Sequence, residues 1–529
     1  MIASTRRHFL SGLMLAGSGL IPGHALAQVS RNLRDNPTFV VSPFQLGIAS
    51  GDPSADGFVI WTRLAPEPLQ PDGGMLMAPM LVKWEIASDD VFRTIVAKGD
   101  AIAHPELAHS VHVEVAGLQP DRPYWYRFRC GSERSLPGRA ITLPLPGARK
   151  DRIRFAVAGC QHYEEGHYTA WRHIAEEPID FVFHYGDYIY EGRDTGPGPR
   201  LMNGRPFSPL RRHVGDEIYS LDDYRRRYAL YKSDHDLQAA HAAAPFFMSF
   251  DDHEVDNNWA ADRDQDGTDP AIFRFRLAAA MQAYYEHMPL RRSSMPVNGQ
   301  MQMFRRASFG DLMDAHFLDT RQYRSDQVQD DRDSPINADV LSPKRTMLGE
   351  RQEAWLFGGL AHGAGRWQLI AQQVMLMQLA QMREGASGPI YSMDQWSGYL
   401  HARQRLLDHI ADRKLTNVMT VSGDAHRHFA GDVLRNGGTG APVTSEYLAT
   451  SITSGSDGIG QSDAYHRAVA GNPFLKAMTD RRGYLICDVG RDTWRGDLRI
   501  LDSVMRPDGQ LSTFASFVTE RGKPGLQRA

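Results

Sequence analysis

A carboxylate and a phenol follow an apolar run in one short segment of the sequence. Residues 181–183 indicate a buried strand, and Asp187 and Tyr190 come shortly after it. Sheets of α/β proteins place their ligands at the carboxyl ends of strands. A carboxylate at such a position can bridge two hard cations, and a phenolate suits a strongly Lewis-acidic metal such as ferric iron. The segment therefore predicts a metal centre.

Three further apolar runs end at side chains that could do similar chemistry. Each signal is weak alone, because a buried cysteine is usually a core residue and a polar pair after a strand is often satisfied within its loop. Their joint occurrence at strand ends favours a functional site built at one edge of a sheet. These ends carry Cys160, then Asp252 with His253, and then Asp424 with His426.

The elements that must position these groups begin with a β-rich region. Residues 38–145 contain runs rich in β-branched and aromatic residues, separated by short polar turns, as at 57–62 and 80–86. Residues 118–127 combine a leucine, a turn proline and an aromatic strand start, which resembles the tyrosine corner of a fibronectin-type sandwich. We therefore predict an all-β fibronectin- or immunoglobulin-like sandwich over residues 38–145.

Beyond a proline-containing linker at residues 143–147, the pattern of the sequence changes. The strand predicted at 152–159 is followed by a helix at 168–176 and by the strand at 181–183. Strands that alternate with helices are typical of an α/β domain. We place this domain at residues 150–520.

The N-terminal segment has the features of an export signal. Residues 1–27 contain a charged start, a short apolar stretch and an alanine-rich end, which indicates a cleaved signal peptide. Arg6 and Arg7 indicate the twin-arginine type, so we predict contact with that export machinery and a periplasmic or secreted protein. An uncleaved anchor is the alternative, but the stretch is short and contains several glycines. We expect no transmembrane anchor after cleavage.

Composition excludes some classes of function. The formal net charge of −4 over 529 residues gives no argument for a stable nucleic-acid complex. The chain has three cysteines, Cys130, Cys160 and Cys487, so one disulfide at most can form and one thiol must remain.

Several blocks of the sequence, in the right order, resemble the signature blocks of the alkaline phosphatase D (PhoD-like) family. That family belongs to the calcineurin-like metallophosphatase group, and the resemblance covers essentially the whole mature chain. It implies an α/β metallophosphatase core of two packed β-sheets flanked by helices, preceded by the β-sandwich. It also implies hydrolysis of phosphate esters, both monoesters and diesters. The matching blocks are 159–161, 186–191, 251–258, 317–324, 369–374 and 422–426.

The sequence departs from the general metallophosphatase pattern at its ligand positions. Cys160 stands where the first Asp-x-His block would be, and Tyr190 replaces the second aspartate of the second block, as in purple acid phosphatases. Asp424 and His426 replace the final His-x-His. These changes remove imidazoles and add oxygen ligands, which favours Fe³⁺ in one pocket and Ca²⁺ in the other. The resemblance implies the same pair of metals.

The resemblance and the ligand chemistry together give an assignment of roles. His253 is the predicted catalytic residue, which protonates the leaving alkoxide or steadies the equatorial oxygens. Asp187 is expected to bridge the two metals, which would activate water against the phosphorus atom. The predicted ligands of Fe³⁺ are Cys160, Asp187, Tyr190 and His426, and those of Ca²⁺ are Asp187, Asp252 and Asp424.

Two alternatives stay open from the sequence. One is a purple-acid-type phosphatase, which Cys160 and the missing histidine-rich final block disfavour. The other is an inactive module that binds a surface, which the presence of every ligand-type residue disfavours.

Other charged segments have competing interpretations. The arginines at 211–212 and 225–227 could bind phosphate, but a solvated helix face is the favoured interpretation. We interpret Arg321 as part of a buried structural pair, and residues 262–267 as a polar surface loop because no glutamate closes a calcium loop there. Asn257, Asn258 and Gln373 are candidates to complete the surroundings of the metals.

Overall fold

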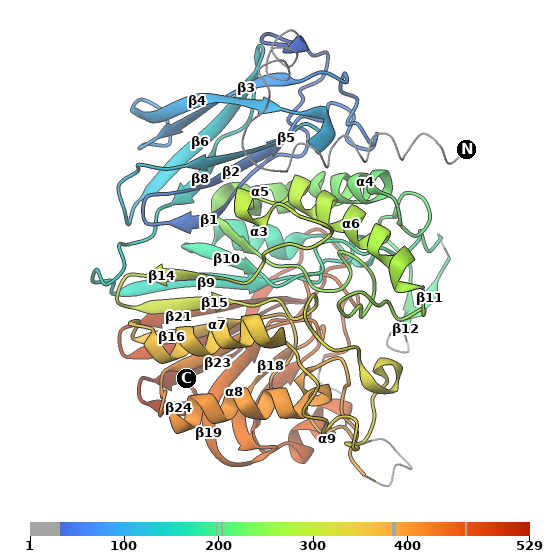
Figure 1. Ribbon diagram of the computed structural model, residues 1–529, viewed down its shortest axis with the longest axis vertical. Helices are drawn as coiled ribbons and strands as arrows, with labels where there is room; N and C mark the ends of the chain where they lie inside the picture. The colour runs from blue at the N-terminus through green and yellow to red at the C-terminus, as the bar shows by residue number, and fades with distance from the viewer. Residues whose placement is uncertain (1–31, 197, 203–204, 383–387, 461–462) are drawn as a thin grey trace.

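The computed structural model describes residues 32–196, 198–202, 205–382, 388–460 and 463–529 (Figure 1). The predicted signal peptide lies outside these residues. Within them, no helix combines the length and the hydrophobicity that a bilayer crossing requires.

Two large sheets form the centre of the molecule. The ten-stranded sheet has the order β24 (Lys523–Arg528), β23 (Leu511–Glu520), β22 (Thr493–Leu501), β21 (Gly483–Gly490), β9 (Arg152–Ala158), β10 (Phe181–His184), β13 (Phe246–Met248), β1 (Ile48–Ser54), β2 (Gly57–Arg63) and β5 (Ser110–Val115). The seven-stranded sheet has the order β14 (Arg305–Phe309), β15 (Met313–Phe317), β16 (Trp367–Ala371), β17 (Val418–Ser422), β19 (Thr439–Leu448), β18 (His428–Asn436) and β20 (Leu475–Thr479).

The two sheets pack face to face over an apolar core. The central strands β9, β10 and β13 run parallel to one another, as do β15, β16 and β17. Their residues are buried on both faces, which is why these strands are apolar almost throughout. Phe247 stacks on Phe317 across the interface at 4.3 Å between ring centroids, and Phe183 lies 5.4 Å from the same ring. The buried aromatic residues therefore fix the two sheets against each other.

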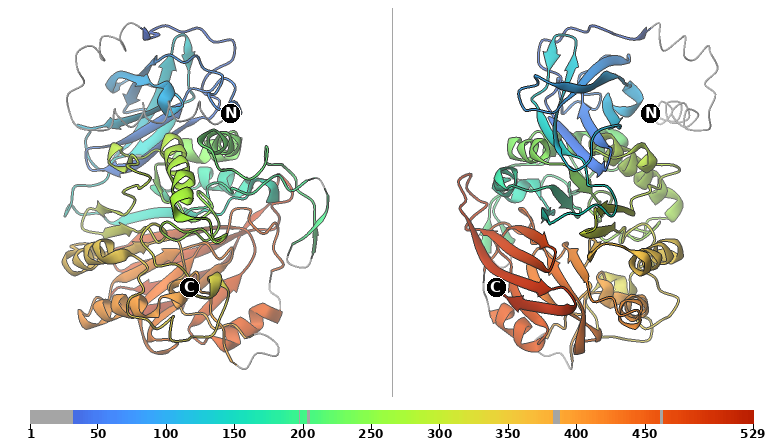
Figure 2. Two further views of the ribbon diagram at one scale, coloured as in Figure 1. Left: turned by 45° about the vertical axis from the view of Figure 1, so that its right-hand side comes forward. Right: turned by 90° about the vertical axis from the view of Figure 1, so that its left-hand side faces the viewer.

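Helices cover the outer faces of both sheets (Figures 1 and 2). One apolar cluster joins β9, β10 and β13 to α3, α4, α5 and α6, and a second joins β16 and β17 to α7 and α8. The right-hand view of Figure 2 shows α7 and α8 on one side of the C-terminal half and the last strands on the other. The helices of the described residues are α3 (Thr169–Glu176), α4 (Leu221–Lys232), α5 (His235–Ala243), α6 (Pro270–His287), α7 (Gly349–His362), α8 (Leu400–Asp412) and α9 (Asp463–Gly471).

The N-terminal strands form a second sheet and also extend the ten-stranded one. A five-stranded sheet shares one apolar cluster with β1, β2 and β5. Gly51 of β1 pairs with Phe246 of β13, and a β-carbon at Gly51 would lie 2.3 Å from the carbonyl oxygen of Pro289. The small sheet contains β4 (Ile95–Ala103), β3 (Met80–Ala87), β6 (Pro123–Cys130), β7 (Glu133–Arg134) and β8 (Gly138–Ile141), and a separate hairpin contains β11 (Arg200–Met202) and β12 (Arg205–Phe207).

This join differs from the arrangement that the sequence predicts. The prediction treats residues 38–145 as a unit with its own two sheets, whereas three of its strands continue the sheet of the α/β region. The α/β character of the larger region agrees with the prediction. The fibronectin- or immunoglobulin-like class of the N-terminal region stays a prediction.

Candidate metal centre

The predicted site residues meet where strands of both sheets end. Cys160 and Asp187 follow β9 and β10, and Asp252 follows β13, all in the ten-stranded sheet. Asp424 and His426 follow β17 in the seven-stranded sheet. The expectation of a site at the edge of one sheet is therefore wrong, because face-to-face packing brings the strand ends of two sheets together.

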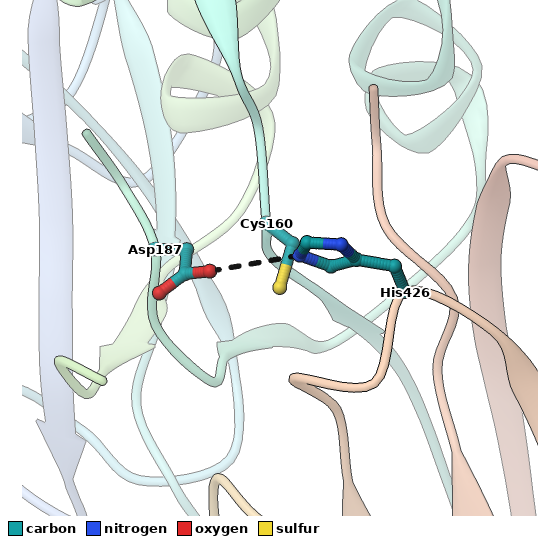
Figure 3. A group of neighbouring side chains, drawn as sticks. All are labelled: Cys160, Asp187 and His426. Carbon is teal, nitrogen blue, oxygen red and sulfur yellow. Dashed lines mark ion pairs between the residues drawn. The ribbon is translucent and has the colours of Figure 1, made fainter. Parts of the chain in front are cut away.

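One group contains a thiol, a carboxylate, an imidazole and a phenol. The ligand atoms of Cys160, Asp187 and His426 lie within 4.8 Å of one another, and Asp187 Oδ2 lies 3.9 Å from His426 Nε2 (Figure 3). Tyr190 Oη lies 2.8 Å from Asp187 Oδ2 and 3.2 Å from His426 Nε2. The four residues predicted as iron ligands are thus near enough to contact one cation.

Carboxylates form the adjoining part of the site. The ligand atoms of Asp187, Asp252 and His253 lie within 4.8 Å of one another, and so do those of Asp251, Asp252 and Asp424. Asp187 belongs to both halves, as a bridging residue must. Asp251 was not among the predicted ligands, although it is fully buried beside Asp252. The Asp-Asp doublet was the signal for it, but the sequence alone does not show that both carboxylates face the same space.

Three carboxylate oxygens of this cluster are buried without a hydrogen-bond donor. They belong to Asp187 (Oδ1), Asp251 (Oδ2) and Asp252 (Oδ1), and no donor among the described residues satisfies them. A buried polar group without a hydrogen-bond partner destabilises the fold by roughly 1–3 kcal/mol, and a charged group does so by more. Cations would remove this cost, so the donor set of oxygens, one thiol, one phenol and one imidazole fits a pair of metal ions.

The backbone is strained at the same positions. Cys160, Asp187, Asp424 and His426 have φ angles of 51°, 54°, 64° and 52°, in the left-handed region that side chains with a β-carbon disfavour. Such strain persists only where the surrounding structure imposes it, and it is concentrated at functional sites. Four of the predicted ligands therefore carry an independent mark of function.

Gly186 explains why a glycine precedes Asp187. Its φ is +134°, and a β-carbon there would lie 2.4 Å from the backbone nitrogen of Asp251. The close approach lets the chain after β10 lie against the chain after β13. The missing side chain therefore allows the carboxylates of Asp187 and Asp251 to share one site.

The carboxylates influence one another's protonation. Burial, and then the charge of Asp252, raises the pKa of Asp187 to about 7. Burial also raises the pKa of Asp251 and Asp424 well above the usual value for aspartate. Burial would raise the pKa of Asp252 as well, but Arg321 and His253 hold it well below its usual range. Without a cation, burial and mutual repulsion therefore disfavour the ionised forms of Asp187, Asp251 and Asp424, and a bound cation would favour them.

Arg321 is the positive charge built into the cluster. Its side chain is fully buried, and its guanidinium contacts four carboxylates. The structure confirms that Arg321 is part of a buried ion-pair network and shows that its charge is already engaged. Its partners are Asp251, Asp394 at 3.0 Å, Asp424 at 3.4 Å and Asp252 at 3.7 Å.

His253 lies beside the carboxylate cluster, and one of its ring nitrogens is hydrogen-bonded to Glu191. Its Nδ1 lies 2.7 Å from Glu191 Oε2, and its ring packs on that of Tyr190 at 4.1 Å between centroids. Burial would lower the pKa of His253, but the carboxylates of Glu191, Asp252 and Asp187 raise it well above its usual value. Glu191 was missed as a functional residue, although it directly follows Tyr190. Its effect depends on a contact 62 residues away in sequence.

Residues around the ligands fix their orientation. Ser454 Oγ lies 2.6 Å from Tyr190 Oη, and the backbone nitrogen of Asn258 donates to Asp252 Oδ2 at 2.8 Å. Gln395 donates to Asp424. The side chain of Gln373 instead bonds to Thr320, Ser249 and Leu318, so its contacts are with the surrounding chain.

Arg225 and Arg227 of α4 are covered rather than solvated. The side chain of Arg225 is 11% exposed and pairs with the buried Glu286, and Arg227 is buried and donates to backbone oxygens, including that of Tyr190. Arg211 pairs with Asp234 at 2.6 Å. Arg211, Arg225 and Arg227 therefore bind groups within the protein, whereas Arg212, with a side chain that is 46% exposed, pairs with Asp194 at the surface. The described cysteines are all free and buried, so no disulfide forms.

The two-sheet α/β fold and the clustered ligand groups define a class of protein, the candidate metalloenzymes. Comparisons with known proteins agree with this class and narrow it. The family model of the PhoD-like phosphatases matches residues 155–498, and the model of the PhoD-like phosphatase N-terminal domain matches residues 29–144. The chain belongs to the PhoD-like phosphatase family.

Individual relatives span almost the whole chain. Alkaline phosphatase D of Bacillus subtilis (strain 168) is 44% identical over 530 residues, which cover 99% of this chain and 89% of the relative. A solved structure described as that of PhoD matches with a TM-score of 0.89 and 43% identity, over 93% of each chain. The protein is therefore a phosphoric ester hydrolase of the alkaline phosphatase D type.

Proposed function

We propose that this hydrolase uses Fe³⁺ and Ca²⁺ held at the junction of the two sheets. Cys160, Asp187, Tyr190 and His426 would hold the iron, and Asp187, Asp252 and Asp424 would hold the calcium, with Asp251 close beside it. The observation that carries the proposal is the set of three buried carboxylate oxygens without donors next to a thiol, a phenol and an imidazole. When bound, the cations would lower the pKa of a coordinated water and offset charge on the phosphoryl oxygens.

The protein side chains then have separate tasks. Arg321 fixes the orientation of the carboxylates, and the hydrogen bond from Asn258 holds one oxygen of Asp252 in place. His253 donates Nδ1–H to Glu191, which leaves Nε2 to give a proton to the departing oxygen. Burial would lower the pKa of His253, but the carboxylate of Glu191 raises it and so favours the form that carries this proton.

Elemental analysis and two assays test this proposal. The purified protein, loaded with both metals, is expected to contain iron and calcium and to hydrolyse 4-nitrophenyl phosphate and bis(4-nitrophenyl) phosphate. A second transition metal in place of calcium would support the purple-acid-type alternative. Binding of neither metal at a stoichiometric level would contradict the proposed centre, even if turnover were found with another ion.

We also propose the domain organisation and the export route. Residues 1–27 act as a twin-arginine signal, 38–145 as the N-terminal sandwich domain and 150–520 as the catalytic domain. The hydrogen bond from the backbone nitrogen of Gln119 to Tyr124 Oη, at 3.0 Å, supports a tyrosine corner. Replacing Arg6 and Arg7 by lysine is expected to block export and leave the precursor in the cytoplasm, whereas cleavage and release of that variant at the wild-type rate would contradict the route.

A further inference from the structure

A cavity opens beside the candidate metal centre. Its volume is about 340 Å³, and Tyr190 and His426 form part of its wall. Four charged side chains also line it: Glu165, Arg427, Asp480 and Arg482. The cavity is therefore where the part of a substrate beyond the reacting phosphate would lie.

Three of these four charges are already matched within the protein. Asp480 accepts hydrogen bonds from the backbone nitrogens of Ile459 and Gly460, and Glu165 Oε2 accepts one from that of Gly455 at 2.7 Å. Arg482 is buried and donates to the carbonyl oxygen of His426 at 3.0 Å. These groups shape the cavity wall but are not free to bind a ligand.

Arg427, unlike the other three charged residues of the cavity, is bound by no group of the residues that the structure describes. Its side chain is exposed, and among the described residues it has no ion pair, hydrogen bond or ring contact. The chain on both sides of it is anchored, because Arg482 binds the carbonyl of His426 and the buried His428 lies 3.0 Å from the carbonyl of Arg499 through Nε2. A fixed backbone thus holds Arg427 at the wall of the cavity, next to a predicted metal ligand, with a guanidinium that no described residue binds.

We propose that Arg427 binds a second anionic group of the substrate, a carboxylate or phosphate carried on an arm of the ester that is hydrolysed. The inference rests on the proposed function, since it places the reacting phosphate at the metal centre. Arg321 cannot serve this purpose because its guanidinium is engaged by four carboxylates. A guanidinium fork matches carboxylate and phosphate oxygens in two parallel hydrogen bonds. Arg427 would therefore determine specificity for substrates with an additional negative charge.

Matched phosphonate inhibitors test this assignment. Alkylphosphonates and ω-carboxyalkylphosphonates of equal length differ only in the second charge, and α,ω-alkanebisphosphonates test whether phosphate replaces carboxylate. Their inhibition constants are measured against hydrolysis of bis(4-nitrophenyl) phosphate by the metal-loaded wild type and by R427Q, R427K and R413Q. Arg413 is an exposed arginine after α8, outside the cavity, and R413Q controls for loss of one surface charge.

The wild type is expected to bind the inhibitors that carry a second charge about tenfold more tightly than the plain alkylphosphonates, as one charge-assisted hydrogen-bonded pair allows. R427Q is expected to lose this preference, R427K to keep part of it, and R413Q to keep all of it. An equal loss of affinity for the inhibitors with and without the second charge, or a preference unchanged in R427Q, overturns the inference. A wild type that neither turns over the substrate nor binds any phosphonate overturns the proposed function itself, which is a distinct result.

Discussion

Tyr190 and Ser454, 264 residues apart in the chain, are joined by a hydrogen bond of 2.6 Å between Oη and Oγ. The same Ser454 hydroxyl lies 2.8 Å from the carbonyl oxygen of Cys160. One short side chain therefore contacts two of the residues proposed to hold iron. Residues of this kind around metal ligands typically change metal affinity or activity by about 10- to 100-fold when they are mutated.

Removal of this hydroxyl is expected to change the colour of the iron-loaded protein. In S454A the Tyr190 phenolate would lose the Ser454 hydroxyl, whose single proton it would share with the carbonyl oxygen of Cys160. The electrons of the phenolate would then move more easily to Fe³⁺, and the charge-transfer band would shift to longer wavelength. S454T keeps the hydroxyl and is expected to absorb near the wild-type wavelength. Visible spectra at matched iron content check this. An S454A band at the wild-type position would show that the hydrogen bond does not influence the phenolate.

Replacement of Asp187 by asparagine is expected to disrupt both halves of the centre. Its carboxylate belongs to both ligand groups, so D187N should lose bound iron and calcium and lower kcat/KM by more than about a hundredfold, beyond the usual effect of a residue around the ligands. D266N, in the exposed loop at residues 262–267, is the matched control and should retain both. Mass-spectrometric metal content and turnover are the measurements, and near wild-type activity in D187N would refute the bridging role.

His253 is expected to matter most for poor leaving groups. If it protonates the departing oxygen, H253A should slow hydrolysis of an alkyl phosphate by about 10²–10⁴-fold, but that of a 4-nitrophenyl ester far less, because nitrophenolate leaves without a proton. H362A is the control, since the exposed His362 contacts the carbonyl of Gly358 within its own helix, α7. Equal losses on both substrates would assign His253 to binding or to metal coordination instead.

A methyl group at Gly186 is expected to separate the two strand ends. G186A would introduce a β-carbon 2.4 Å from the nitrogen of Asp251 in a left-handed conformation, so we expect a loss of about 2 kcal/mol or more in the free energy of unfolding, with weakened metal binding. Gly358 lies on the exposed side of α7 with no atom within 4 Å of an added β-carbon. G358A should instead stabilise by about 0.5–1 kcal/mol. Urea unfolding measures both, and a G186A protein as stable as the wild type would contradict the steric argument.

The buried Lys232 is expected to make the free energy of unfolding depend on pH, and comparison with K232M measures this contribution. Burial lowers the pKa of this amine to about 7, and its Nζ lies 4.1 Å from the ring centroid of Trp61. The unfolded chain keeps the ordinary pKa of about 10.4, so between about pH 7 and 10 it binds more protons than the folded protein. The stability of the wild type relative to K232M should therefore rise with pH across this window and be lowest below pH 7.

The size of this change is limited by the aromatic contact. Each pKa unit corresponds to about 1.4 kcal/mol, and the attraction between the ammonium and Trp61 offsets part of the burial penalty, so we expect a change of about 2–3 kcal/mol. Urea unfolding of both proteins near pH 6, 7.5 and 9 provides the measurement, with buffers chosen around the value of about 7. A difference between the two proteins that does not vary with pH would contradict a titrating Lys232.

The ligand-type residues could be predicted from sequence because each follows an apolar strand. Cys160, Asp187, Asp252 and Asp424 stand at such ends, and strand ends that point the same way must meet near one another. The sequence could not show that two sheets supply them. That depends on the packing of aromatic residues such as Phe247 and Phe317 across the interface, which leaves no local pattern.

Contacts between distant residues at the site could not be predicted from the sequence either, because they leave no local pattern. Several contacts at the site join segments that are far apart in sequence, so they can be recognised only in the folded structure. They are those of Arg321 with four carboxylates, of Glu191 with His253, and of Ser454 with Tyr190. The pairing of Gly51 with Phe246, which joins the N-terminal strands to the large sheet, likewise depends on close backbone approach rather than on a turn or periodicity signal.

The residues that surround the proposed ions are spread from position 160 to position 454. A ribosome must therefore finish most of the polypeptide before any segment can encounter all of its coordinating neighbours, and contacts so remote in sequence form late and slowly. Insertion of the proposed ions would consequently follow the synthesis of most of the chain. Protein made without these ions would then be a metal-free precursor, to which the ions are added after synthesis.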